Sequence, residues 1–119
     1  MKVVQNGEET LDKLDKIFQL QKDLAAFISS DRYPSRKEER VSVLCTAITH
    51  EAIELQRLTN WKWWKKKVEF DENQAREELI DILHFVVQTA IELNISPQAI
   101  LDEYLKKNEI NRQRHLNDY

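Results

Sequence analysis

Glycine and proline are scarce in this chain, and this scarcity constrains the fold more than any other feature. The 119 residues include one glycine and two prolines. Sandwiches and barrels of β-strands need many tight turns, which draw heavily on these two residue types. A mainly β fold is therefore disfavoured, and long helices with few connections fit better. The length suits one domain, which we expect to span residues 1–119.

Apolar residues recur at helical spacing in four segments, and this pattern predicts an all-α fold. The first stripe covers residues 11–28 and is broken by the polar, proline-containing stretch 29–34. Ser35 followed by Glu38 has the spacing of a capping box, so we expect the second helix to begin there.

The third and fourth helices also have recognisable ends. Asp71 followed by Gln74 is a cap signal for a third helix that runs to about Leu93. Ser96 fits an N-cap and Pro97 the first helical position, so a fourth helix begins there. Four helices with short links predict a four-helix bundle.

Two pairs of acids share one spacing, Glu51 with Glu54 and Glu78 with Asp81. Residues three apart in a helix lie side by side. Glu51 falls within an apolar stripe, and Asp81 lies on the third helix, whose apolar residues surround most of its axis and predict a central position. Carboxylates gathered there would repel one another unless a cation lay between them. Neither stripe contains lysine or arginine, so the pattern predicts a divalent metal held by all four acids.

Oxygen ligands favour Mg²⁺, with Mn²⁺ as a substitute, over zinc. Mg²⁺ keeps positions open for water and phosphate oxygens, which indicates phosphoryl or nucleotidyl chemistry. A di-iron centre is the competing interpretation, because His84 stands three residues after Asp81 and helical bundles hold iron with such motifs. The first acidic pair has no matching histidine, so we prefer Mg²⁺. Solvated acids on amphipathic helices are the alternative without a metal.

These motifs resemble those of the all-α nucleoside triphosphate pyrophosphohydrolases, the superfamily of MazG and the dimeric dUTPases. Its members carry E-x-x-E on one helix and E-x-x-D on the next, as the two acidic pairs do here. Residues 77–85 are similar to the second motif of the dimeric dUTPases, and residues 61–65 to the aromatic segment after the first pair. The resemblance runs from Gln21 to Tyr119. Its closing Y-x-x-K-N-x-x-N-x-x-R pattern matches Tyr104, Lys107, Asn108, Asn111 and Arg114.

The resemblance implies hydrolysis between the α and β phosphates of a nucleoside triphosphate, with dUTP as the expected substrate and Mg²⁺ as the cofactor. It implies a homo-oligomer, commonly a dimer. Glu51 and Glu54 are the expected catalytic residues. Within the enzyme class, the alternative is a broader MazG-like activity on dCTP or modified nucleotides. Outside it, the alternative is a non-catalytic helical dimer used for binding or regulation.

Five residues are expected to contact the substrate. By the resemblance, Gln21 reads uracil and Trp61 stacks on the base. Phe85, one turn after Asp81, is expected to flank the base. Lys107 and Asn111 share one face of the fourth helix and suit a triphosphate. For each residue the plain alternative is structural: a buried hydrogen bond, core packing or a solvated helix face.

Two positions depart from the pattern of the relatives. Dimeric dUTPases carry a further glutamate where this chain has Leu58, usually preceded by asparagine where it has Arg57. MazG-type sequences often carry a glutamate where it has His50. The missing acids belong to the metal and water-activating shell, so the metal count and the general base stay open.

Charge and composition limit the partners and the location. The net charge of −3 argues against nucleic acid as a partner. No apolar run approaches the roughly 20 residues that span a bilayer, and the N-terminus turns acidic too early for a signal peptide. The lone cysteine, Cys45, excludes an intramolecular disulfide and is expected to be buried. We expect a soluble, cytoplasmic protein that binds neither nucleic acid nor membrane.

Overall fold

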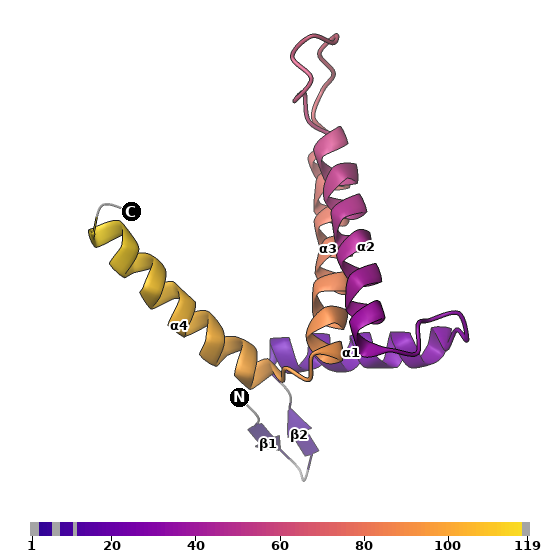
Figure 1. Cartoon of the computed structure of the whole chain (residues 1–119), viewed down its shortest axis with the longest axis vertical. Helices are drawn as coiled ribbons and strands as arrows, with labels where there is room; N and C mark the ends of the chain where they lie inside the picture. The colour runs from indigo at the N-terminus through magenta and orange to yellow at the C-terminus, as the bar shows by residue number, and fades with distance from the viewer. Residues whose placement is uncertain (1–2, 6–7, 11, 118–119) are drawn as a thin grey trace.

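Four helices make up most of the chain in a computed structural model, which describes residues 3–5, 8–10 and 12–117 (Figure 1). The helices are α1 (Lys13–Ile28), α2 (Lys37–Arg57), α3 (Glu72–Glu92) and α4 (Pro97–Leu116). The predicted all-α class is confirmed. Ahead of α1, the short strands β1 (Val3–Gln5) and β2 (Glu8–Thr10) pair antiparallel, a hairpin that the helical pattern does not predict.

Side-chain caps begin three of the helices, and two of these caps were predicted. The Asp71 carboxylate accepts a hydrogen bond from the Gln74 backbone N–H at the start of α3. The Ser96 hydroxyl accepts one from Ala99 at the start of α4, where Pro97 occupies the first turn. Both contacts satisfy backbone donors that the first helical turn leaves unpaired.

The capping box predicted at Ser35 is wrong. Helix α2 begins at Lys37, and its N-cap is Arg36, whose side chain makes no capping hydrogen bond. The Glu38 carboxylate is engaged elsewhere, 3.6 Å from the Arg36 guanidinium. The Ser35 carbonyl accepts a hydrogen bond from Arg40 at 2.7 Å.

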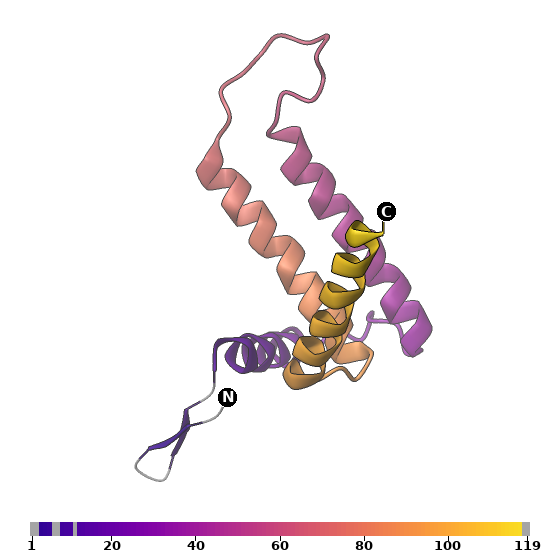
Figure 2. The same ribbon diagram turned by 90° about the vertical axis from the view of Figure 1, so that its left-hand side faces the viewer.

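Helices α2 and α3 run side by side and antiparallel, and α1 crosses them near one end (Figures 1 and 2). Helix α4 packs only against α1 among the described elements. It leaves the end of α3 at a bend of 103°. Asn94 enables this reversal with a positive φ of 59°, a conformation that asparagine tolerates better than most residues. Apart from this bent pair, no described helix passes a length and hydropathy test for a membrane span.

The core of a single chain is small. Phe18, Val87 and Ala90 are buried together where α1 crosses α3, and Leu14, Ile91, Ile95 and Ile100 pack around them. The radius of gyration is 18.3 Å, against about 14 Å for a compact chain of this length. Many large apolar side chains stay exposed, among them Phe27 at 83% and Leu105 at 57%.

Cys45 is exposed, so the expectation that it is buried is wrong. Helix α2 packs along α3, and Leu44 is its one buried residue among those described. No other described element packs against α2. An apolar sequence neighbourhood therefore did not imply burial at this position.

Candidate functional site

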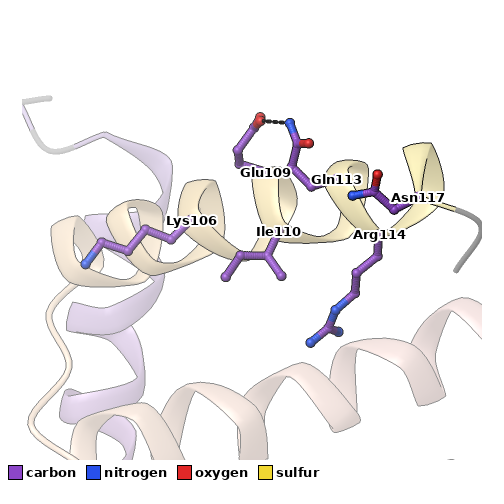
Figure 3. Close-up of a pocket in the computed structure, with 6 residues that line it drawn as sticks. All are labelled: Lys106, Glu109, Ile110, Gln113, Arg114 and Asn117. Atoms are coloured by element: carbon purple, nitrogen blue, oxygen red, sulfur yellow. Dashed lines mark hydrogen bonds between the residues drawn. The ribbon is translucent and has the colours of Figure 1, made fainter.

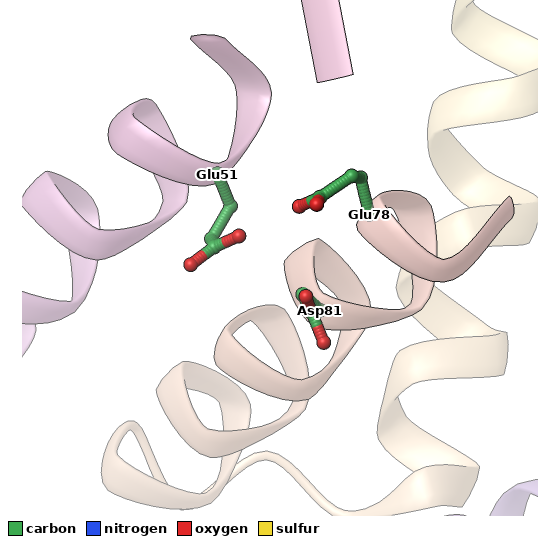
Figure 4. A group of neighbouring side chains, drawn as sticks. All are labelled: Glu51, Glu78 and Asp81. Carbon is green, nitrogen blue, oxygen red and sulfur yellow. The ribbon is translucent and has the colours of Figure 1, made fainter. Parts of the chain in front are cut away.

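Three of the four predicted acids converge between α2 and α3. Glu51 projects from α2 toward Glu78 and Asp81 on α3 (Figure 4). Each offers one carboxylate oxygen, and these three oxygens all lie within 4.8 Å of one another. The antiparallel pairing of the helices brings the two motifs to the same level, and the three-residue spacing puts both α3 acids on one side.

The surroundings of Glu51 raise the pKa of its carboxyl. Partial burial raises the pKa of the Glu51 carboxyl, and the charges of Asp81 and Glu78 raise it further. Gln74 donates one hydrogen bond to Glu78 at 3.0 Å. Within the described part of the chain, no lysine or arginine forms an ion pair with these three acids. Among the described residues, the cluster therefore has no compensating cation.

The donor set fits a hard divalent cation. Oxygens bound to one Mg²⁺ at about 2.1 Å lie at most about 4.2 Å apart. The three carboxylate oxygens, within 4.8 Å of one another, would need only small side-chain shifts to share one ion. Three carboxylates leave coordination positions for water and phosphate oxygens.

Glu54 lies outside the group. Its carboxylate is 3.5 Å from the Arg57 guanidinium on the same helix, and about half of its side chain is exposed. Its charge still contributes to the raised pKa of Glu51, after burial and the two α3 acids. The structure thus brings three acids together and leaves the fourth one turn away. A metal-binding role for Glu54 stays a prediction.

A cavity of about 660 Å³ opens beside the acids, between α1, α2 and α3. This volume falls in the range of small-molecule sites. Glu51 and Asp81 line one part, and apolar side chains from all three helices line much of the rest. The other lining residues are Gln21, Leu24, Ala25, Ile28, Ser29, Ser30, Tyr33, Leu44, His84, Phe85 and Gln88.

A second hollow of about 700 Å³ runs along α4 (Figure 3). All of its lining side chains come from that helix and its C-cap residue: Lys106, Glu109, Ile110, Gln113, Arg114 and Asn117. One helix cannot enclose a ligand, and no group of three acids lies in this hollow. The cavity beside the carboxylates is the better candidate site.

Gln21 and Phe85, two of the predicted substrate contacts, do line the cavity. Both ends of the Gln21 amide are already engaged. Its nitrogen donates to Gln88 at 3.1 Å, and its oxygen lies 2.8 Å from His84 Nδ1. Gln88 was not predicted, although it follows Asp81 by seven residues and so lies on the same helix face, a spacing that could have identified it.

Trp61 lies away from the cavity. It sits in the connection between α2 and α3, which extends beyond the ends of both helices (Figure 2). The side chain of Asn60 closes this loop with two hydrogen bonds to the Val68 backbone, at 2.8 and 2.9 Å. Trp61 packs edge-to-face on Trp64, with ring centroids 6.0 Å apart, and is 46% exposed.

Lys107 and Asn111 are also remote from the acids. Both are exposed on α4, which does not pack against α2 or α3. The bend after α3 carries the fourth helix away from α2 and α3 (Figure 1). Within one chain, the structure therefore does not place these two residues at the site.

Comparison with protein families gives a match to the dUTPase family over residues 13–100. Comparisons with curated proteins and with solved structures gave no match. The matched segment runs from the start of α1 into α4, so it contains both acidic pairs and every residue that lines the cavity. It stops before Lys107 and Asn111. This chain therefore belongs to the dUTPase family of all-α nucleotide hydrolases.

Proposed function

We propose that the protein hydrolyses a nucleoside triphosphate, with dUTP as the preferred substrate, to the monophosphate and pyrophosphate. The observation that carries this proposal is the cluster of Glu51, Glu78 and Asp81 beside a cavity of about 660 Å³. Family membership supports the reaction class. The cavity volume accommodates a nucleoside, and the acids would hold the metal that binds its phosphates.

Glu51, Glu78 and Asp81 would hold Mg²⁺, and Mn²⁺ could replace it. The bound ion would neutralise charge on the phosphate oxygens and make an attacking water more acidic. Glu54 is one turn from Glu51 and outside the three-acid group. It is therefore the acid available to accept a proton from that water.

The cavity divides into parts that suit a nucleotide. Apolar side chains such as Leu24 and Phe85 would flank the base. The Gln21 and Gln88 amides offer polar groups that could read its edge. Because Gln21 already bonds to His84 and Gln88, selection for uracil could be relaxed, and this observation favours the broader MazG-like activity as the second candidate.

We further infer that the working unit is a homodimer. One chain leaves large apolar side chains uncovered on α1, α3 and α4. It also leaves Trp61, Lys107 and Asn111 away from the acids. A second copy would cover apolar surface and could bring such residues to the neighbouring site.

A pyrophosphate-release assay over a panel of nucleotides, with and without Mg²⁺, tests the proposal. We expect Mg²⁺-dependent release with dUTP as the best substrate. Glu78→Gln should abolish it, because an amide is a weaker ligand for a hard cation. Glu77→Gln, the same change at an exposed neighbour, is the matched control and should keep activity. Release from no nucleotide would refute the enzyme, and equal release from several would favour the broader activity.

A further inference from the structure

A chain of hydrogen bonds runs from Glu92 to His84 along one wall of the cavity. Gln88 Nε2 donates to Glu92 Oε2 at 3.3 Å. Gln21 Nε2 donates to Gln88 Oε1 at 3.1 Å, and Gln21 Oε1 lies 2.8 Å from His84 Nδ1. This chain, which we call the amide relay, links α1 to α3 and ends on an imidazole that lines the cavity.

Glu92 fixes which group donates and which accepts along the relay, because a carboxylate can only accept hydrogen bonds. Burial acts to raise the pKa of Glu92, but hydrogen bonds from Tyr33 and Arg40 outweigh it and lower the pKa. Tyr33 Oη donates at 2.6 Å and Arg40 Nε at 2.8 Å. Burial and the bond to Glu92 raise the pKa of Tyr33 to about 12, so the phenol keeps its proton. Glu92 is thus a carboxylate, and Gln88 must turn its NH₂ group toward it.

Each following group then has one possible orientation. Because the Gln88 nitrogen donates to Glu92, the Gln88 oxygen faces Gln21. Gln21 must then donate to it from its own amide nitrogen. The Gln21 oxygen therefore faces His84, and an amide oxygen only accepts. The Nδ1 atom of His84 must carry a proton. A neutral imidazole carries one proton, so His84 Nε2 is left as an acceptor.

The place of His84 indicates which part of a nucleotide it meets. It follows Asp81 by three residues, one turn of α3 further from the acids, and Gln88 lies another turn on. If the acids hold the phosphates through a metal, the sugar is the next group along the substrate. His84 Nε2 forms no hydrogen bond with any residue in the described part of the chain.

We propose that His84 Nε2 accepts a hydrogen bond from the 3′-hydroxyl of the bound nucleotide, and that Gln21, Gln88 and Glu92 are positioning residues that fix this tautomer. The assignment of the sugar rests on the proposed function. The tautomer itself follows from the relay alone, and it can be measured without any nucleotide.

Nitrogen-15 NMR of the histidine rings tests the tautomer. At a pH where the ring is neutral, we expect protonated Nδ1 and unprotonated Nε2 for His84 in the wild type. Gln88→Leu breaks the relay and should shift His84 toward the other tautomer. Gln98→Leu is the matched control, since Gln98 on α4 also donates a hydrogen bond to a carboxylate four residues later, that of Asp102. It should leave His84 unchanged.

Two results would overturn the relay. One is a wild-type His84 that carries its proton on Nε2. The other is a Gln88→Leu protein with the wild-type His84 spectrum. If Gln88→Leu does not fold, Gln88→Met keeps the length of the side chain while removing its amide, and the wild-type spectrum decides in either case.

Binding of two hydrolysis-resistant nucleotides tests the sugar contact. The probes are the α,β-imido analogues of dUTP and of its 3′-deoxy counterpart, titrated by calorimetry with Mg²⁺. Loss of the hydroxyl should weaken binding to the wild type about tenfold, the worth of one net hydrogen bond. In His84→Leu the ratio of the two dissociation constants should fall to about one. An unchanged ratio in that variant, or no preference in the wild type, would refute the contact.

These outcomes separate the inference from the proposed function. Tight binding of the probes without hydrolysis of dUTP would refute the enzyme while leaving the sugar contact decided by the ratio. If neither probe binds, both the enzyme and the sugar contact are refuted, and the spectra still decide whether the relay fixes the tautomer.

Discussion

Glu51 and Glu54 are one turn apart on α2, yet their surroundings give them different chemistry. Glu51 is partly buried and faces Glu78 and Asp81, and this raises its pKa. Glu54 is half exposed and lies beside Arg57. We propose that the first shares a cation with its neighbours and that the second accepts a proton from the attacking water.

The raised pKa of Glu51 predicts a pH-dependent stability in the metal-free protein. The folded state holds this proton more tightly than the unfolded state, where the usual value is 4.5. Its stabilisation is therefore present below about that pH and lost as the pH rises through the folded pKa. Glu51→Gln should melt at a higher temperature than the wild type at pH 7 without metal. The difference should shrink as the pH falls toward 4.5. A constant difference in thermal melts from pH 7 to pH 4.5 would contradict it.

Glu54→Gln should lower kcat by roughly 100-fold or more while leaving the fold intact, because it removes the proposed proton acceptor. It should also weaken the stabilisation by Mg²⁺ if Glu54 turns to the metal when one is bound. Glu69→Gln, in the connection between α2 and α3, is the control and should do neither. Pyrophosphate release and thermal melts with and without Mg²⁺ measure both effects. Full activity of the Glu54 variant would place the proton acceptor elsewhere.

At the scale of elements, features that depend on neighbouring residues could be predicted from the sequence, whereas contacts between distant residues could not. The caps at Asp71 and Ser96 depend on a few neighbouring residues, and the sequence contains all of them. The pairing of Glu51 with the α3 acids follows from the spacing of two motifs on adjacent helices. Near Ser35, where no cap forms, Arg40 reaches across the fold to Glu92 and also bonds the Ser35 carbonyl. Such a contact cannot be read from local spacing.

The amide relay could not be predicted either, because it also depends on contacts between residues far apart in the sequence. Gln21 on α1 meets Gln88 on α3 only because α1 crosses the end of the α2–α3 pair. A buried hydrogen bond was the structural alternative for Gln21, but the sequence could not identify the partner. The direction of α4 could not be predicted from the sequence either, since it depends on the backbone conformation at Asn94.

In the loop between α2 and α3, the side chain of Asn60 near one end bonds the backbone of Val68 near the other end. Asn60→Ala removes both hydrogen bonds and should loosen the loop, so trypsin should cut faster at the exposed lysines, residues 62 and 65–67. Asn73→Ala, an exposed asparagine in the first turn of α3, is the control. Equal digestion rates for the two variants would show that the contacts do not hold the loop.

At the scale of the whole molecule, a single chain leaves many of its large apolar side chains exposed to solvent. Only three side chains form the buried cluster among the described residues. The radius of gyration of the chain is 18.3 Å, which exceeds the value of about 14 Å for a compact chain of this length. On α3, Leu79 is 55% exposed and Ile80 is 50% exposed, although this helix was expected to be central. Exposed apolar faces of this extent are typical of surfaces that pack against a partner.

Sedimentation of the wild type should therefore give twice the chain mass of 14.2 kDa at micromolar concentration. Leu79→Asp puts a charge on the uncovered face of α3 and should shift the equilibrium toward the monomer, because burying an unpaired charge is costly. Asn73→Asp adds the same charge to an exposed polar position of that helix and should leave the dimer intact. If residues of the second copy complete the site, pyrophosphate release by Leu79→Asp should fall on dilution in parallel with dissociation. A wild type that sediments as a monomer, or a monomeric variant with full activity, would show that one chain suffices.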